Sequence, residues 1–111
     1  MMNLLTCVGR IVSEPNLEEL ESGKKACKIT LAVPRSFKNE EGIYETDFID
    51  IVLYNNIATN IIEYCHKGDL IGIKGRLQTD TYETENGDKK KTMYVVADKV
   101  SFLASKSTNE D

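Results

Sequence analysis

The sequence predicts an all-β protein with one helix, folded as a five-stranded Greek-key barrel. Apolar residues alternate along several stretches, which is the period of strands with one buried face. A single stretch, residues 55–68, switches to a helical period, and glycines inside the strand patterns mark the bends of a small barrel. Because the order is three strands, one helix and a two-stranded hairpin, the helix lies between strands 3 and 4.

The 111 residues fit one domain, and 41% hydrophobic with 29% charged residues is ordinary for a globular protein. We expect this domain to span residues 1–104 and residues 105–111 to form a short polar tail. The sequence has no apolar run near the ~20 residues of a membrane span and no secretory-signal pattern at its N-terminus. We therefore expect a cytoplasmic protein with no membrane partner.

Cysteine and histidine indicate neither a metal site nor a catalytic site. Cys7, Cys27 and Cys65 are far apart and each lies in an apolar stretch, which predicts buried free thiols in a reducing compartment. The only histidine, His66, falls in the last turn of the predicted helix, where a solvated capping role is expected. Without a nucleophile–base pairing or a glycine-rich phosphate loop, the sequence predicts neither an enzyme nor a cofactor.

The first strand is predicted over residues 4–12, with Gly9 as a bend that lets one strand take part in both ends of the barrel. Residues 13–25 contain a proline, a Ser-Gly pair and four glutamates, which predicts an exposed, turn-rich connection or a short irregular hairpin. The second strand is predicted over residues 26–33. It should end at Pro34, because proline cannot continue a central ladder.

A polar loop is predicted at residues 35–45, and it places Phe37 between Arg35 and Lys38. A loop aromatic between two cations suits the stacking of a nucleic-acid base with phosphates beside it. The alternative, in which Phe37 folds back onto the core, is equally compatible with the sequence.

The third strand, residues 46–54, has two chemically different faces. Because side chains alternate along a strand, its core face carries Ile49, Ile51 and Leu53. The opposite face carries Phe48, Asp50, Val52 and Tyr54. An aromatic side chain at each end of a solvent-side strand face predicts platforms on which bases stack.

The helix at residues 55–68 is predicted from one apolar stripe, consisting of Ile57, Ala58, Ile61, Ile62 and Cys65. Asn55 or Asn56 can cap its start, and Gly68 suits the position just past its end.

The last two strands are predicted over residues 70–82 and 92–103, joined by a hairpin turn at Asn86-Gly87. Gly72 and Gly75 indicate bending or close backbone approach. Alternation divides the first of these strands into two faces. The apolar, core-like face carries Ile71, Ile73 and Leu77, and the polar face carries Lys74, Arg76, Gln78, Asp80 and Tyr82.

This order of elements is typical of the OB-fold, a small barrel that commonly binds oligonucleotides or oligosaccharides. The residues carry a family resemblance as well. The stretches LAVPRSFKN, TDFIDIVLY and KGDLIGIKGRLQT, within a match over nearly the whole chain, resemble bacterial and phage single-stranded DNA-binding proteins. The resemblance implies sequence-nonspecific binding and protection of single-stranded DNA in replication, recombination or repair.

The resemblance also implies the stacking residues, which are Phe37, Phe48, Tyr54 and Tyr82. For the DNA backbone we expect contacts from the cations Arg35, Lys38, Lys67, Lys74, Arg76, Lys89, Lys90 and Lys91. The implied partners are single-stranded DNA and further copies of the chain. A homotetramer of dimers that pair through their first strands is expected, with a dimer as the alternative, at a nucleoid-associated location.

Three features depart from the family pattern. Two lie on the binding face: there is no Trp, and positions that are often basic in the family are Asp50, Gln78 and Asp80. We therefore expect weaker and more salt-sensitive binding. The sequence finishes at STNED, without the linker and acidic tip of typical bacterial members, so tail-dependent replication partners are not expected.

Two alternatives to a DNA-protecting protein stay open. One is a primosome-type accessory barrel that joins DNA to other replication proteins. The other is an adaptor that acts mainly through protein–protein contacts, which the acidic net charge favours.

Overall fold

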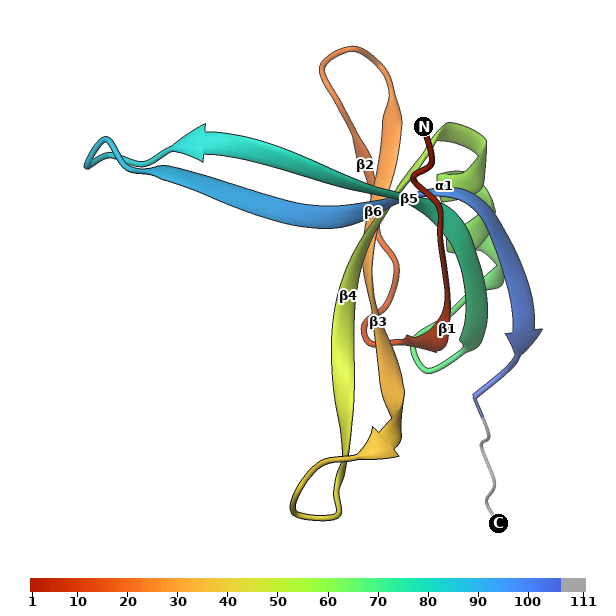
Figure 1. The fold of residues 1–111 in the computed structure, drawn as a ribbon. Coiled ribbons are helices and arrows are strands. Elements are labelled where there is room, and N and C mark those ends of the chain that lie inside the picture. The colour runs from red at the N-terminus through yellow and green to blue at the C-terminus, as the bar shows by residue number, and fades with distance from the viewer. Residues whose placement is uncertain (107–111) are drawn as a thin grey trace.

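The computed structural model describes residues 1–106. Its strands are β1 (Leu5–Ile11), β2 (Leu17–Glu19), β3 (Lys25–Lys38), β4 (Tyr44–Tyr54), β5 (Leu70–Glu83) and β6 (Lys89–Ala104), and its helix is α1 (Asn55–Tyr64). The predicted barrel of five main strands with a helix between the third and fourth is confirmed (Figure 1). The connection at residues 13–25 contributes the three-residue β2, which pairs with the start of β3.

The barrel closes because β1 has two partners. It pairs antiparallel with β5 from Leu5 to Arg10, and then with β3 at Arg10 and Ile11. The opposite wall is closed by a short parallel pairing of β4 with β6. Gly9 lies where β1 changes partner, and a Cβ atom there would come within 2.6 Å of the Ala32 carbonyl oxygen. The glycine therefore permits the close backbone approach that closes the barrel.

The core is aliphatic and lies inside the barrel beneath α1. Its fully buried side chains include Leu31, Ile51, Leu53, Ile71 and Val95. Ala58 and Ile61 of α1 are buried against this core, as the apolar stripe predicted, and Cys65 joins them just after the helix. The three cysteines are free thiols, and burial raises the pKa of each.

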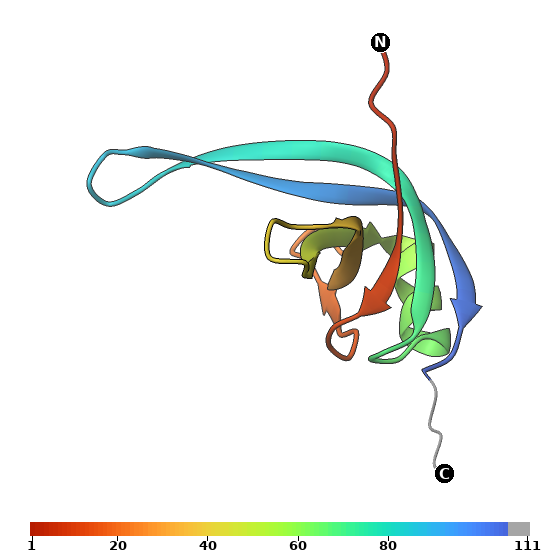
Figure 2. The ribbon, with the colours of Figure 1, turned by 60° about the horizontal axis from the view of Figure 1, so that its bottom comes forward.

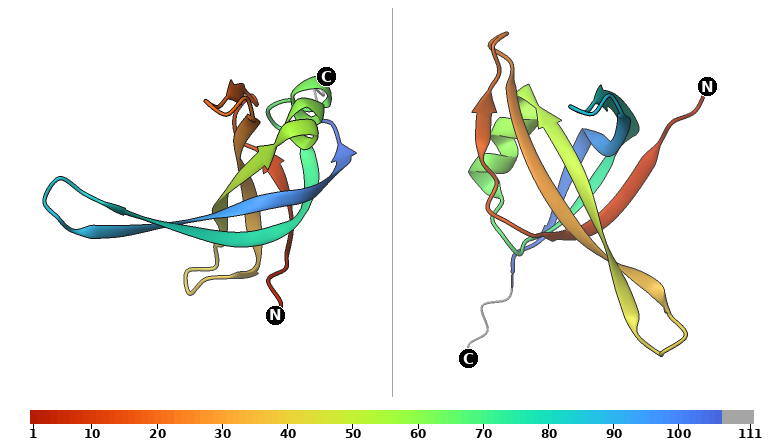
Figure 3. Two further views of the ribbon diagram at one scale, coloured as in Figure 1. Left: turned by 90° about the horizontal axis from the view of Figure 1, so that it is seen from above. Right: turned by 90° about the vertical axis from the view of Figure 1, so that its left-hand side faces the viewer.

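Two long hairpins leave the barrel as arms. The β3–β4 arm and the β5–β6 arm project in different directions (Figures 1 and 2), and the β5–β6 arm curves away from the barrel wall in the left view of Figure 3. Positive φ angles at Gly42 and Gly87 allow the tight turns at the two tips. The hairpin predicted at Asn86-Gly87 is confirmed, with the Gly87 N–H donating to the Thr84 carbonyl.

Two predictions about the β3–β4 region were wrong. β3 does not end at Pro34, which pairs with Thr46 and is followed by strand as far as Lys38. Among residues 1–106, β1 pairs with β3 only at Leu31 and Ala32, so within this part of the chain one edge of β3 is open at Pro34 and the missing N–H is tolerated. The predicted loop at residues 35–45 is consequently an extended arm with a turn at residues 39–43.

The helix is shorter than predicted. It ends at Tyr64, so His66 lies in the following turn and not in the last turn of the helix. The N-cap is Tyr54 without a side-chain hydrogen bond, and the Asn55 side chain instead accepts a hydrogen bond from the Lys25 N–H at 3.3 Å. Gly68, at φ 92°, lies in the turn before β5.

Leu77 was predicted on the core side of β5, but it is exposed. At this point β5 is leaving the barrel, and the Leu77 backbone is held by Asn3 through two hydrogen bonds of 2.8 and 2.9 Å. The strand alternation is preserved, but there is no core beneath this part of the arm. Of the predicted tail, residues 107–111 lie outside the described residues.

Candidate nucleic-acid interface

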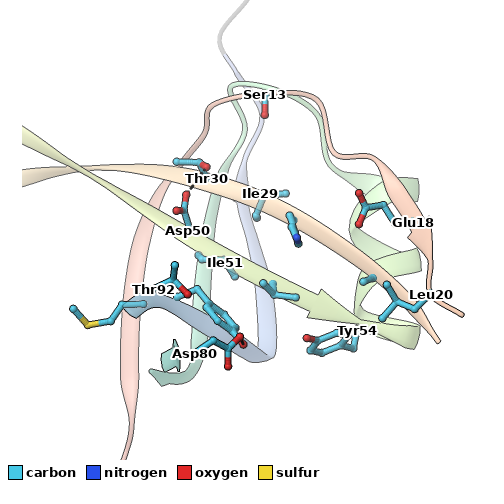
Figure 4. A pocket seen from close by; sticks show the side chains of 15 residues that line it. Ser13, Glu18, Leu20, Ile29, Thr30, Asp50, Ile51, Tyr54, Asp80 and Thr92 are labelled. Atoms are coloured by element: carbon cyan, nitrogen blue, oxygen red, sulfur yellow. Dashed lines mark hydrogen bonds between the residues drawn. The ribbon is translucent and has the colours of Figure 1, made fainter. Parts of the chain in front are cut away.

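The outer face of the sheet carries a cleft of about 610 Å³ (Figure 4). It lies over β3 and β4 and reaches β5 and β6 on one side and the β2–β3 turn on the other. Its lining includes the side chains of Glu18, Lys28, Asp50, Val52, Tyr54, Asp80 and Tyr94.

Strand register explains why these side chains share a face. Thr30 is opposite Asp50, and the pair is fixed by a hydrogen bond of 2.9 Å from the threonine hydroxyl to Asp50 Oδ1. Residues directly opposite in an antiparallel pair point to the same side. Lys28 opposite Val52 and Phe48 opposite Ala32 therefore lie on this outer face, as the alternation of residues 46–54 predicted.

The structure exposes three of the four predicted stacking aromatics. The relative exposures are 63% for Phe37, 65% for Phe48 and 53% for Tyr82. Phe37 therefore does not fold back onto the core. Tyr54 is half-buried and lines the cleft, with the Lys24 ammonium 4.0 Å from its ring centre.

The four aromatics are not gathered in one pocket. Phe48 and Tyr54 share the outer face of β4, whereas Phe37 lies on the β3–β4 arm and Tyr82 on the β5–β6 arm. A strand of nucleic acid that reached all four would have to follow the surface from one arm across β4 to the other.

Arg35, predicted as a backbone contact, is engaged by two carboxylates. Its Nε and Nη2 donate to both Asp47 oxygens at 2.9–3.3 Å, and its Nη1 donates to Glu45 at 3.0 Å. Hydrogen bonds from the guanidinium lower the pKa of Asp47, and the same pair raises the pKa of Arg35. The local sum of one positive and two negative charges leaves this part of the arm acidic.

The cations of the β5–β6 arm are better placed. Lys90 is directly opposite Tyr82, so the two share a face, and Lys89 and Lys91 flank that pair. Arg76 lies nearer the barrel, with Nη1 3.5 Å from Asp98 Oδ1. On the β3–β4 arm, the Lys38 ammonium lies 5.6 Å from the ring centre of Tyr44, its register partner.

Two predicted cations lie away from the cleft. Lys67 is exposed in the turn after α1, where its backbone N–H donates to Glu14. Lys74 is exposed between Thr6 of β1 and Lys99 of β6. The structure therefore brings neither together with Tyr54 or Phe48.

Sequence reasoning missed Tyr94, the second aromatic side chain in the cleft. Its hydroxyl donates to Asp80 Oδ2 at 2.8 Å and accepts a hydrogen bond from the Gln78 amide at 2.9 Å. The bond to Asp80 stabilises the protonated phenol and raises the pKa of Tyr94. The Asn86-Gly87 pair did not signal this position, because a two-residue turn there would put Thr79 opposite Tyr94, whereas the observed turn at residues 84–88 puts Gln78 there.

Within residues 1–106, no group of three or more His, Cys, Asp and Glu side chains is arranged to hold a metal ion. No helix in the same part of the chain is both long enough and apolar enough to cross a membrane.

The barrel with its exposed aromatic face agrees with comparisons to known proteins. The family model for the single-strand binding protein family matches residues 2–103. The chain belongs to this family. Its relatives include single-stranded DNA-binding protein B of Bacillus subtilis, which is 41% identical over 106 residues, covering 96% of this chain and 94% of that protein.

Two further relatives support the family assignment. Single-stranded DNA-binding protein 1 of Staphylococcus aureus is 40% identical over 111 residues, covering 100% of this chain and 71% of that protein. Among solved structures, the Plasmodium falciparum SSB complex with ssDNA superposes with a TM-score of 0.81 at 25% identity. That alignment covers 93% of this chain and 96% of the other.

Proposed function

We propose that this protein binds single-stranded DNA without sequence preference and protects it in replication, recombination or repair. The observation that carries the proposal is the outer face of β4, which presents Phe48 and Tyr54 beside an open cleft in a member of the single-strand binding family. The named relatives and the DNA-bound structure of a similar barrel support it.

Base stacking supplies the main attraction in the proposed mechanism. Each base that stacks on an aromatic ring contributes about 1–3 kcal/mol with little dependence on which base it is. The flat faces of bases are hidden in a duplex and exposed in a single strand, so the same contacts select single strands. The proposed mechanism consists of DNA binding and contains no catalytic step.

The arms extend the contact surface. On the β5–β6 arm, Tyr82 and Lys90 pair an aromatic face with a cation that can follow the phosphates. On the β3–β4 arm, Phe37 supplies an exposed ring, and the ammonium of Lys38 lies 5.6 Å from the ring centre of Tyr44. Arg76 has the same strand alternation as Tyr82, whereas Lys89 and Lys91 lie on the opposite face of the β5–β6 arm. Lys67 and Lys74 lie away from the cleft, so they can contribute only where a strand wraps beyond it.

Self-association follows from the exposed edge of β1. Only Arg10 and Ile11 of β1 pair with β3, so the backbone of residues 5–9 is open on that side in the described chain. Val8 and Leu103 are both exposed and both approach the position of Gly72, which makes an apolar patch across β1, β5 and β6. We propose a homotetramer built of dimers, with a dimer as the alternative. Light scattering of the wild type gives the mass that distinguishes a tetramer, a dimer and a monomer. Val8→Lys, which places a charge in the apolar patch, should lower that mass.

The proposed location is the cytoplasm, in association with the nucleoid, because single-stranded DNA arises there in bacteria. The binding unit is a single domain over residues 1–104.

An adaptor that works mainly through protein contacts is the second candidate function, and the acidic lining of the cleft by Glu18, Asp50 and Asp80 is the observation that favours it.

The decisive experiment is alanine substitution of Phe48. Fluorescence anisotropy of a labelled dT oligonucleotide should show an affinity loss of about fivefold or more, because one stacked base is lost. Tyr64→Ala is the matched control, since Tyr64 is also an exposed aromatic but lies on α1. Circular dichroism should be unchanged in both variants. If wild type does not bind dT even at low salt, the adaptor function replaces the proposal.

A further inference from the structure

Tyr94 and Tyr54 stand on the same outer face with an apolar floor between them. Val52 of β4 is the register partner of Val96 of β6, and the two are only 8% and 5% exposed. Tyr54 lies two residues after Val52 on β4, and Tyr94 lies two residues before Val96 on β6. Both tyrosines line the cleft. Because side chains alternate along strands, the rings rise from this face on either side of the valine pair.

The Tyr94 ring is held in place before any ligand arrives. Gln78 and Asp80 of β5 bind its hydroxyl from two sides, at 2.9 and 2.8 Å. The carboxylate of Asp50 is held similarly, by a hydrogen bond of 2.9 Å from the hydroxyl of its register partner Thr30 (Figure 4). A ring and carboxylates that are already ordered lose little conformational freedom on binding, which favours a defined ligand pose.

The charge of the cleft decides which part of a nucleotide enters. Glu18, Asp50 and Asp80 contribute three carboxylates to the lining, against the single ammonium of Lys28. A phosphate would be repelled by this surface, whereas an uncharged base would not. Within residues 1–106, Asp50 Oδ2 and Asp80 Oδ1 have no protein hydrogen-bond partner, so each can accept a hydrogen bond from a ligand.

From this geometry we infer that the cleft is a nucleobase subsite in which Tyr94 is a fifth stacking platform and Asp50 and Asp80 favour bases with an amino donor, such as cytosine, over thymine. The inference rests on the proposed single-stranded DNA binding. The other stacking platforms remain indifferent to sequence, and only this subsite distinguishes between bases. The N4 amino group of cytosine donates to a carboxylate, whereas the O4 atom of thymine is an acceptor and faces a carboxylate unfavourably. The phosphates stay outside the cleft, on the side of Tyr54 where the Lys24 ammonium lies.

The stacking half of the inference is tested with Tyr94→Leu, which removes the ring and keeps an apolar side chain. Affinity for dC and dT oligonucleotides of 20 nucleotides, measured by anisotropy, should fall about fivefold or more for both. Tyr64→Leu on α1 is the matched control and should leave both affinities unchanged. Equal affinities for wild type and Tyr94→Leu, with circular dichroism unchanged, would overturn the role of Tyr94.

The base-preference half is tested with the double variant Asp50→Ala/Asp80→Ala. Removing two negative charges should strengthen binding of every oligonucleotide, so the readout is the ratio of dC to dT affinity within each protein. That ratio should fall about threefold or more from wild type to the variant, since two acceptor positions are lost. A ratio that does not change would show that the carboxylates act only as charges.

The outcomes separate this inference from the proposed function. If wild type binds neither oligonucleotide, the proposed function fails. If wild type binds both and Phe48→Ala weakens binding while Tyr94→Leu does not, the proposed function stands and only the subsite is refuted. Tyr94→Phe adds a readout of orientation, because it keeps the ring and loses both hydroxyl bonds. It should retain more affinity than Tyr94→Leu, and equal losses in the two variants would contradict stacking.

Discussion

Replacing Asp47 by Asn should strengthen the binding of single-stranded DNA. Arg35 lies two residues before Phe37 on β3, yet Asp47 holds its Nε and Nη2 and Glu45 holds its Nη1. A phosphate must compete with both carboxylates for the guanidinium. Asp47→Asn removes one negative charge and the stronger of the two contacts, because the paired bonds of an Arg–carboxylate fork are lost. Arg35 then becomes available to the DNA backbone.

The expected magnitude follows from counting phosphate contacts. One additional cation–phosphate contact steepens the dependence of log K on log salt by about 0.7 for a single strand. The advantage of the variant over wild type should therefore grow about fivefold for each tenfold decrease in salt concentration. The same pair gives a check on the starting structure. Arg35 lowers the pKa of Asp47 below its usual 3.8, so an NMR titration of wild type should place that carboxyl group below this value.

The assay is anisotropy of a labelled dT oligonucleotide at four salt concentrations. Glu63→Gln on α1 is the matched control, because it changes the net charge by the same amount on an exposed helix residue. The control should show wild-type slope. An unchanged or shallower slope in Asp47→Asn would refute the reasoning. In that case the Arg35–Asp47 pair would serve to stiffen the arm, and its loss would weaken stacking at Phe37.

The remaining predictions concern stability and titration. Gly75→Ala should destabilise the fold by about 1–3 kcal/mol in urea unfolding, because its Cβ would clash with the Val96 carbonyl oxygen. Gly72→Ala, whose Cβ meets nothing closer than 3.7 Å, should cost much less, and equal losses would contradict the packing argument. Leu31→Ala should cost about 2–5 kcal/mol, since Leu31 is fully buried, and a smaller loss would mean that the barrel core collapses around the gap. The pKa of the Tyr94 phenol, followed by ultraviolet absorbance, should lie above the usual value of 10. Asp80 accepts a hydrogen bond from the protonated phenol, and this bond is lost when the pH rises through the pKa of Tyr94. Asp80→Asn should bring the titration down, and an unchanged midpoint would exclude the hydrogen bond.

Much of the fold could be predicted because it depends on local periodicity. The alternation of residues 46–54 identified both the core face and the outer face of β4, and the apolar stripe of residues 57–65 identified the buried side of α1. Asn86-Gly87 identified a hairpin turn from two residues alone. Each of these signals acts over a few residues, so the rest of the chain does not need to be known.

The misses share a cause. Pro34 is a strand breaker only where both edges of a strand are paired, and the sequence does not show that β1 has already left β3 there. Leu77 has the parity of a core residue, but its exposure depends on where β5 leaves the barrel. The same holds for Arg35, whose availability depends on the register that places Asp47 within reach.

By itself, the sequence determined the order of the main strands and the helix, which side of β4 faces outward, and that Phe48 and Tyr54 lie on that side. Only the tertiary structure decided that Tyr94 joins Tyr54 across a valine floor, that Asp50 and Asp80 make the cleft acidic, and that Arg35 is already paired. The physical reason is that alternation within one strand is a local property of the backbone. Charge pairing and the walls of a cleft depend on registers between strands that lie far apart in the chain.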